Sequence, residues 1–333
     1  MTNPQTMNSY HVFGGVLRSE LAFPELDVAE RGDPDWTLTV TFTPAPDVPL
    51  GPQLGEDRVD VDVLVHSYAT PSGFRLVYDD TGVFDVSEGG RAIRWHRPPS
   101  ADLEAGRLDV LGRVLALALH ASGWLSLHGS AVALGDGAVA FLAPKGNGKS
   151  TLAFALMRAG AALMTDDTVV IEPGRPSIVR PGVQSVRLFQ DSADWLSAPA
   201  PLAGTSDIKA TFGQLASDAR RLTRAPLAAL YLLESVPAGT IAAPVERERI
   251  EGPAAVFQLI TQTKIGTLLG GIEAPTVFGS VVGIAEGAPV YRLRVTRDYE
   301  QLQKVIERIV GWHGGVGARA LPSTAPLPDP QLR

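Results

Sequence analysis

The run Pro144-Lys145-Gly146-Asn147-Gly148-Lys149-Ser150-Thr151 is the most informative part of the sequence. Residues 138–143 before it are apolar and predict a buried strand, which pairs with 130–134 across the turn Gly135-Asp136-Gly137. Residues 149–158 after it predict a helix. Strands alternate with helices along the second two-thirds of the chain, so the sequence predicts an α/β fold.

The loop has the spacing of a P-loop, G-x-x-x-x-G-K-[ST], with Ala143 in place of the first glycine. Gly146 and Gly148 let the backbone curl, so that successive N–H groups face phosphate oxygens at the start of a helix. Lys149 adds a positive charge for the β- and γ-phosphates, and the Ser150 hydroxyl can hold Mg²⁺. The loop, which we call the phosphate loop after this prediction, therefore predicts a site for ATP and Mg²⁺. The predicted nucleotide-binding residues are Lys145, Gly146, Asn147, Gly148, Lys149, Ser150 and Thr151.

Two adjacent carboxylates, Asp166 and Asp167, follow the next apolar strand, residues 162–164. This position places them at the sheet edge that carries the phosphate loop. One carboxylate can associate with the metal, and the other can accept a proton from an attacking hydroxyl. An Asp-Asp turn that merely ends a strand is the alternative, which the neighbouring loop makes less favourable.

Four segments together resemble the catalytic domain of HPr kinase/phosphorylase, a domain related in structure to ATP-dependent phosphoenolpyruvate carboxykinase. They are His128-Gly129-Ser130-Ala131-Val132, the hairpin after it, the phosphate loop and Thr165-Asp166-Asp167, within a resemblance that covers about residues 123–300. The resemblance implies a P-loop kinase core in which His128, Lys149 and Asp166 are catalytic and Asp166 is the proton acceptor. It places Asp167 with Ser150 at the metal. A packed structural histidine is the alternative interpretation of His128.

The arrangement of the chain as a whole more closely resembles the HPr-kinase-related proteins of ribosomal-peptide maturation, including the lasso-peptide kinases. The similar motifs are Phe13-Gly14, Ser19-Glu20-Leu21, Pro24-Glu25-Leu26 and Arg187-Leu188-Phe189. This resemblance implies that the acceptor is a serine of a peptide or small protein, with a lasso-type precursor as one candidate. The Arg-Gly segment of true HPr kinases has no convincing equivalent after the acidic pair.

Arg180, Arg187 and Lys209 are candidates for binding substrate phosphate or the phosphoryl group in transfer. A guanidinium fork matches phosphate oxygens, which favours the two arginines. Lys209 stands out because the chain has few lysines; the five are Lys145, Lys149, Lys209, Lys264 and Lys304. Solvent-exposed cations on loops are the alternative for all three.

The chain is expected to divide into a β-rich N-terminal module (1–102), an HPr-kinase-like catalytic domain (103–313) and a disordered tail (314–333). Short β-type runs separated by turn residues indicate the module, and residues 45–57, rich in Pro and Gly, predict a loop. Leucines at helical spacing predict an amphipathic helix over 103–122.

Composition excludes several classes of protein. The chain has 333 residues, 45% of them hydrophobic, which suits about two folded domains. It has no cysteine, so thiol chemistry and Cys-ligated metals are excluded. The formal charge of −7 argues against a nucleic-acid or anionic-membrane partner. With neither a secretory signal nor a membrane span in the sequence, a cytoplasmic protein is expected.

Two other functions remain open at this level. One is a lyase of the phosphoenolpyruvate carboxykinase type, for which the additional metal-binding His and Lys residues are missing. The other is an ATP-binding regulatory or accessory protein without kinase activity. The sequence also leaves open whether the chain forms a homo-oligomer.

Overall fold

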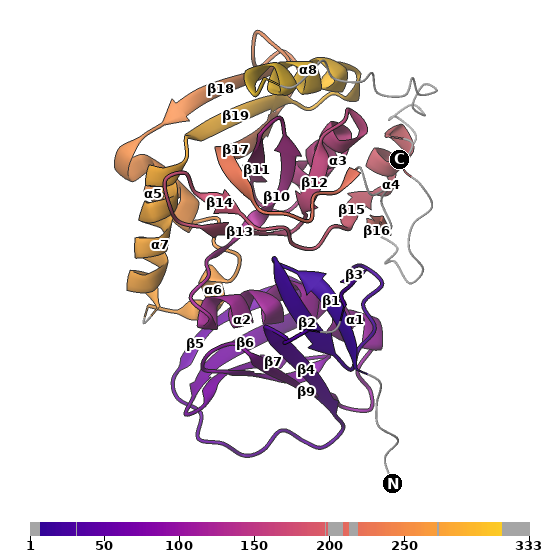
Figure 1. Cartoon of the computed structure of the whole chain (residues 1–333), viewed down its shortest axis with the longest axis vertical. Helices are drawn as coiled ribbons and strands as arrows, with labels where there is room; N and C mark the ends of the chain where they lie inside the picture. The colour runs from indigo at the N-terminus through magenta and orange to yellow at the C-terminus, as the bar shows by residue number, and fades with distance from the viewer. Residues whose placement is uncertain are drawn as a thin grey trace.

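Two large β-sheets, with helices between and around them, make up a mixed α/β fold (Figure 1). The structure is a computed structural model and describes residues 7–30, 32–196, 198, 209–212, 219–271 and 273–314. The predicted disordered tail lies, apart from Gly314, outside these residues. The mixed α/β class expected from the sequence is therefore confirmed, while the division into domains stays a prediction.

The first sheet has nine strands and contains the predicted meander. In spatial order they are β3 (Asp27–Val28), β1 (Asn8–Val12), β2 (Gly15–Ser19), β4 (Trp36–Thr41), β9 (Ala92–His96), β8 (Gly82–Ser87), β7 (Gly73–Tyr78), β6 (Val63–Thr70) and β5 (Gln53–Asp60). The predicted loop over 45–57 is wrong in its last part, because β5 pairs there with β6. Alternating exposed and half-buried residues in β5 carry too few large apolar side chains to signal a strand.

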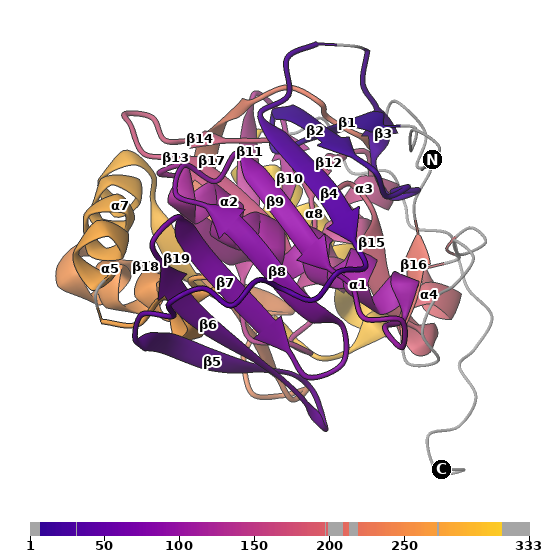
Figure 2. The same cartoon turned by 90° about the horizontal axis from the view of Figure 1, so that it is seen from below.

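One face of this sheet packs on the helical segment that follows it, and Figure 2 views the sheet with that segment behind it. The segment consists of α1 (Leu103–Asp109), a π-helical turn η1 (Val110–Val114) and α2 (Leu115–Ala121), in agreement with the predicted helix. Asp102 caps it by accepting from the N–H of Ala105 at 2.8 Å. A Cβ at Gly106 would lie 2.3 Å from the Trp95 ring, so only glycine allows this close packing.

The second sheet carries the phosphate loop. Its main path is β11 (Gly137–Leu142), β10 (Ser126–Leu134), β13 (Thr168–Glu172), β14 (Ile178–Val179), β17 (Ala225–Val236), β19 (Val290–Thr296) and β18 (Val245–Ile250). Strand β12 (Ala162–Thr165) also pairs with β10, and β11 pairs in parallel with β17. The short strands β15 (Val186–Phe189) and β16 (Lys209–Phe212) form a separate ribbon.

Most of the remaining helices lie around the second sheet, whereas α6 (Gly266–Leu269) packs on β5 and β6 of the first sheet (Figure 1). The others are α3 (Lys149–Arg158), α4 (Gln190–Trp195), α5 (Gly252–Ile260), α7 (Ala274–Gly287), the 3₁₀ turn η3 (Tyr299–Gln301) and α8 (Leu302–Trp312). The apolar faces of α3 and α8 form one hydrophobic core with one side of the sheet. The other core includes α2, α7 and the first sheet.

Helix α6, which comes late in the chain, packs on β5 and β6 of the first sheet. The hydroxyl of Ser67 donates to the carbonyl of Leu268. A Cβ at Gly55 would lie only 1.9 Å from the carbonyl oxygen of Thr267, so this contact requires glycine. The edge of the first sheet is therefore fitted to a segment from late in the sequence.

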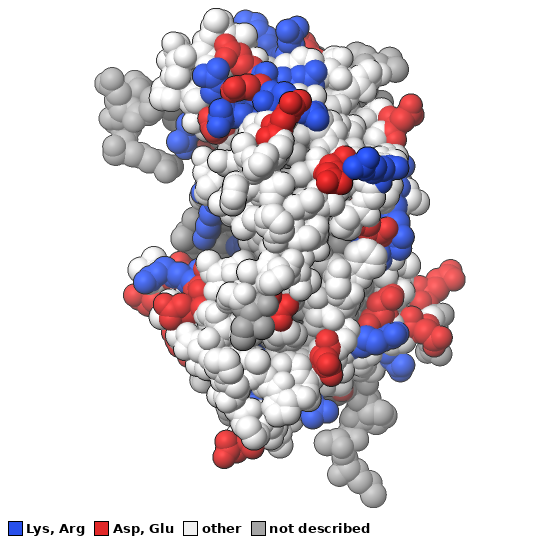
Figure 3. Space-filling model, turned by 90° about the vertical axis from the view of Figure 1, so that its left-hand side faces the viewer, with Lys and Arg blue, Asp and Glu red and all other residues white. Residues whose placement is uncertain are grey.

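The charge cluster Glu246–Arg249 lies in the edge strand β18. Glu246 contacts Arg294 and Glu248 contacts Arg292 across to β19, and acidic and basic side chains intermix at this end of the molecule (Figure 3). Such cross-strand pairs stabilise a solvated sheet surface by small amounts.

Within the described part of the chain, no helix has both the length and the apolarity to cross a bilayer.

A buried carboxylate lies at the centre of the helical segment. Asp109 is 7% exposed and accepts from the Thr81 hydroxyl at 2.7 Å, while the Thr81 carbonyl accepts from Trp95 Nε1. Burial raises the pKa of Asp109 to about 7. The folded-state pKa of Asp109 lies above the unfolded value, so at a pH between the two values the folded state holds one proton more than the unfolded state. The free energy of unfolding therefore falls as the pH rises towards 7.

We expect Asp109→Asn to remove this pH dependence, because the amide still accepts from Thr81 and cannot ionise. The free energy of unfolding of the variant, relative to that of the native chain, should rise by about 1–3 kcal/mol between about pH 5 and about pH 8, because the folded carboxyl ionises only near pH 7. Urea unfolding at both pH values measures the difference. An equal difference at the two values would contradict the assignment.

Candidate functional site

The phosphate loop joins β11 to α3 in a strained turn. Gly146 and Gly148 have φ values of 88° and 84°, which favour glycine, and α3 begins at Lys149. The buried Lys149 ammonium donates to the carbonyl oxygens of Ala143 and Pro144 at 2.7 and 3.0 Å. The Lys149 side chain thus folds back on the start of its own loop.

The other predicted loop residues are exposed or half-buried. Lys145 is exposed, and Asn147 Nδ2 donates to the Pro144 carbonyl at 3.3 Å. Thr151 lies on α3 and donates to the Ser192 hydroxyl at 3.3 Å. The carbonyl of Asn147 accepts from Ser235 at the end of β17, which anchors the loop to the neighbouring strand.

The acidic pair lies at the same sheet edge as the loop. Strands β11 and β12 are both antiparallel to β10, so they run in one direction and end at one edge. Strand β10 pairs with β12 and then with β13, and the chain kinks between these two at Asp166 and Asp167. Asp167 has a φ of 69°, a left-handed conformation that Asp tolerates better than most residues. The expected placement of the pair is therefore observed.

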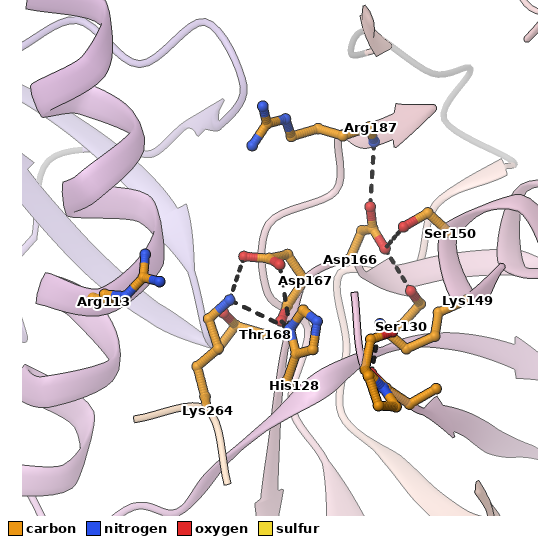
Figure 4. A network of polar contacts seen from close by, with 12 residues as sticks. Arg113, His128, Ser130, Lys149, Ser150, Asp166, Asp167, Thr168, Arg187 and Lys264 are labelled. Carbon is orange, nitrogen blue, oxygen red and sulfur yellow. Dashed lines mark hydrogen bonds and ion pairs between the residues drawn. The ribbon is translucent and has the colours of Figure 1, made fainter. Parts of the chain in front are cut away.

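Asp166 is the buried member of the pair and joins three elements (Figure 4). Its Oδ1 atom accepts from Ser130 of β10 at 2.5 Å and from Ser150 of α3 at 2.9 Å. Its Oδ2 atom accepts from the backbone N–H of Arg187 in β15 at 3.3 Å. Burial raises the pKa of Asp166, although the hydrogen bond from Ser130 opposes the shift. A raised pKa suits a carboxylate that takes up a proton.

Asp167 has the opposite environment. Its side chain is half exposed, and its Oδ2 atom lies 2.6 Å from Lys264 Nζ. His128 Nδ1 lies 3.4 Å from Oδ1 and 3.1 Å from the Asp167 carbonyl oxygen. Burial acts to raise the pKa of Asp167, but the charge of Lys264 outweighs it and holds the pKa well below the usual range. Asp167 therefore stays ionised.

His128 lies beside the acidic pair, as the resemblance implies. Burial, together with the charge of Lys264, lowers its pKa to about 4, so the ring is neutral near pH 7. Its backbone N–H donates to the carbonyl of Gln262, which ties β10 to the segment that carries Lys264.

Sequence reasoning missed two members of this network, Lys264 and Ser130. Lys264 follows α5 and reaches the site because residues 262–264 pair with the start of β10; its N–H donates to the Ser126 carbonyl at 2.9 Å. The only signal in the sequence was the scarcity of lysine. Ser130 lay within a motif, but nothing in its type marked it as a partner of Asp166.

The three candidate phosphate-binding cations lie in different places. Arg187 extends from β15 towards the helical segment that carries Arg113 (Figure 4), and its buried Nε atom has no hydrogen-bond partner among the described residues. Arg180 is buried elsewhere, with contacts to Glu172 at 2.7 Å and to the Phe13 carbonyl. Lys209 lies in β16 opposite Phe189, and its side chain is outside the described residues. Of the two arginines, the structure brings Arg187 and not Arg180 to the acidic pair.

The donor set beside the loop fits Mg²⁺. Ser150 supplies a hydroxyl and the acidic pair supplies carboxylates, and Mg²⁺ typically takes one or two carboxylates together with substrate phosphates and water. Among the described residues no cluster of three or more His, Cys, Asp or Glu side chains forms a dedicated metal cage. The residues present therefore suit a metal that arrives with a nucleotide.

We expect Lys264→Met to raise the pKa of His128 by about one unit, because the substitution removes a positive charge 3.5 Å from Nδ1. The protonated fraction of His128 near pH 5 should rise accordingly. Titration by NMR, with the signal assigned through His128→Gln, measures the pKa. Lys304→Met is the matched control, and an unchanged His128 pKa in Lys264→Met would contradict the contact.

Comparisons with known proteins find likenesses among solved structures. No protein-family model and no curated protein sequence matches the chain. Among solved structures, the chain is similar to the Hpr(Ser) kinase/phosphatase from Coxiella burnetii, with 15% identity and a TM-score of 0.31 over 57% of this chain and 95% of that one. A likeness at this level carries no functional inference. The HPr-kinase-like family and its lasso-peptide subtype stay predictions, and the function depends on the geometry of the site.

Proposed function

We propose that the chain is an ATP- and Mg²⁺-dependent kinase that transfers the γ-phosphoryl group to a hydroxyl. One observation carries the proposal: the Ser150 hydroxyl of the phosphate loop lies 2.9 Å from Oδ1 of the buried Asp166. Phosphate-binding groups and a carboxylate with a raised pKa therefore meet at a single sheet edge. Kinase catalysis needs little more than this, because it works mainly through positioning and charge stabilisation.

The loop would bind the phosphates. Its backbone N–H groups and the N-terminal end of α3 favour anions, and Lys149 would exchange its carbonyl partners for the β- and γ-phosphates. The terminal N–H groups of the Arg187 guanidinium, which extends from β15 beside the acidic pair, would contact the phosphoryl group in transfer. Lys209, whose side chain is not described, and Arg180, whose guanidinium contacts Glu172, are not part of this proposal.

The reaction balances with these groups. The acceptor oxygen bonds to the γ-phosphorus as the bond from that phosphorus to the β–γ bridging oxygen breaks, and ADP leaves. The hydroxyl proton passes to Asp166, whose raised pKa suits a proton acceptor. The neutral ring of His128 lies beside the pair and would orient Asp167 or the acceptor.

Ser150 and Asp167 would hold the metal, which supplies charge neutralisation between the phosphates when bound. Lys264 Nζ lies 2.6 Å from Asp167 Oδ2, so it would exchange this contact as the nucleotide enters. The Ser150–Asp166 hydrogen bond makes Asp166 a competing metal neighbour. The two aspartates therefore need separate tests.

We propose a serine of a peptide or small protein as the acceptor, with a lasso-type ribosomal peptide precursor as one specific form, in the cytoplasm. An ATP-binding regulator without transfer is the alternative. Incubation with γ-labelled ATP distinguishes them, since a kinase labels an acceptor and a regulator binds ATP without labelling one.

We expect Lys149→Ala to weaken nucleotide binding about tenfold to a hundredfold, because it removes a charged phosphate donor. Lys304→Ala on α8 is the matched control, since that lysine contacts only Gln301 among the contacts described. Titration with a fluorescent ATP analogue measures the dissociation constant. Unchanged binding in Lys149→Ala would count decisively against the proposed site.

Asp166→Asn and Asp167→Asn should separate the two roles. The variant that removes the proton acceptor should lose about 10²–10⁴-fold in transfer rate while MgATP still binds. The variant that removes the metal carboxylate should lose the dependence of ATP affinity on Mg²⁺. We expect the first result for Asp166→Asn and the second for Asp167→Asn, and the reverse pattern would exchange the roles.

A further inference from the structure

A pocket lies between the helical segment and the acidic pair. Its core side includes Asp167 and Arg187, and its other side is formed by Glu25, Leu108 and the turn at 111–112 of η1. The pocket is a shallow one of about 50 Å³ that opens to solvent. It borders the carboxylates on the side where an attacking hydroxyl must arrive.

The pocket carries two buried polar atoms that have no partner among the described residues. Glu25 is 4% exposed at its side chain; its Oε1 atom pairs with Arg107 Nε at 3.1 Å, and its Oε2 atom accepts no hydrogen bond. The Nε–H of Arg187 on the core side donates none. An unsatisfied buried acceptor and an unsatisfied buried donor each cost free energy, which a ligand can recover.

The wall between these atoms is apolar and notched. Leu108 and Leu111 present aliphatic surface, and Gly112 leaves a gap in which an added Cβ would meet no atom within 4 Å. The notch falls within the π-helical turn η1, a helix irregularity that often occurs at functional sites.

We propose that this pocket holds the acceptor as a peptide, with an apolar residue beside the serine. This inference rests on the proposed function. The main-chain N–H and C=O groups of the peptide complement Glu25 Oε2 and Arg187 Nε, and the flanking side chain packs on Leu108 and Leu111. The serine hydroxyl then faces the acidic pair. The N-terminal part of the chain thereby selects the acceptor.

The test uses serine peptides that differ only in the residue beside the serine, with γ-labelled ATP and the full-length chain. Peptides with Leu, Ile or Met at that position should be labelled about tenfold better than those with Asp or Lys, because packing such a side chain on Leu108 and Leu111 removes apolar surface from water. Equal labelling of apolar and charged peptides would overturn the proposal.

A graded series at one position then tests the pocket itself. Gly112→Ala and Gly112→Leu suit a helix better than glycine and fill the notch. They should raise the KM for the peptide progressively, about tenfold or more for Leu. Gly279→Leu in α7 is the matched control, because a Cβ there also meets no atom within 4 Å. Glu25→Gln should raise the same KM by removing the anionic acceptor.

The outcomes separate this inference from the proposed function. A raised peptide KM in Gly112→Leu, with unchanged affinity for the ATP analogue and a native melting temperature, supports the pocket. A native peptide KM in that variant overturns the inference and leaves the kinase proposal standing. Labelling of free serine in place of every peptide overturns the peptide acceptor. A native chain that binds no ATP analogue overturns the proposed function and this inference together.

Discussion

A buried carboxylate, that of Asp166, is the constraint on which the site depends. An ionised group taken out of water is costly unless hydrogen bonds compensate it. Here the compensation comes from Ser130 of β10, Ser150 of α3 and the backbone of Arg187 in β15. Each of these elements must keep its place for the others to remain satisfied. One side chain therefore links the phosphate loop, the sheet edge and the β15 ribbon.

The two neighbouring aspartates show how the local environment moves the pKa values of identical side chains in opposite directions. Burial raises the pKa of Asp166, whereas Lys264 holds the pKa of the half-exposed Asp167 low. Such divergence between paired carboxylates is a common basis for separate acid–base and electrostatic functions. The left-handed backbone of Asp167 produces it, because the kink turns one side chain into the core and leaves the other beside the pocket.

The strand, loop and helix over 137–158 could be predicted because their signals are local: apolar runs, glycines and a helix of small and apolar residues. Strand β5 and helix α7 were missed, the first because its buried side is weakly apolar and the second because glycines interrupt its pattern. Lys264 could not be placed, since its position depends on pairing between segments more than 130 residues apart. The division of the chain into domains stays a prediction. The helical segment, which the sequence assigned to the catalytic domain, packs against the first sheet.

The contact of α6 with the edge of the first sheet has a consequence for biosynthesis. Ser67 meets Leu268 across 201 positions of sequence, so the ribosome exposes this edge long before its cover exists. At usual elongation rates the interval is about 10–40 s. An uncovered edge strand invites pairing between nascent chains, and the charges of Glu56, Asp57 and Arg58 along β5 oppose it. The charged, weakly apolar sequence of β5, which does not signal a strand, thus also disfavours pairing between unfinished chains.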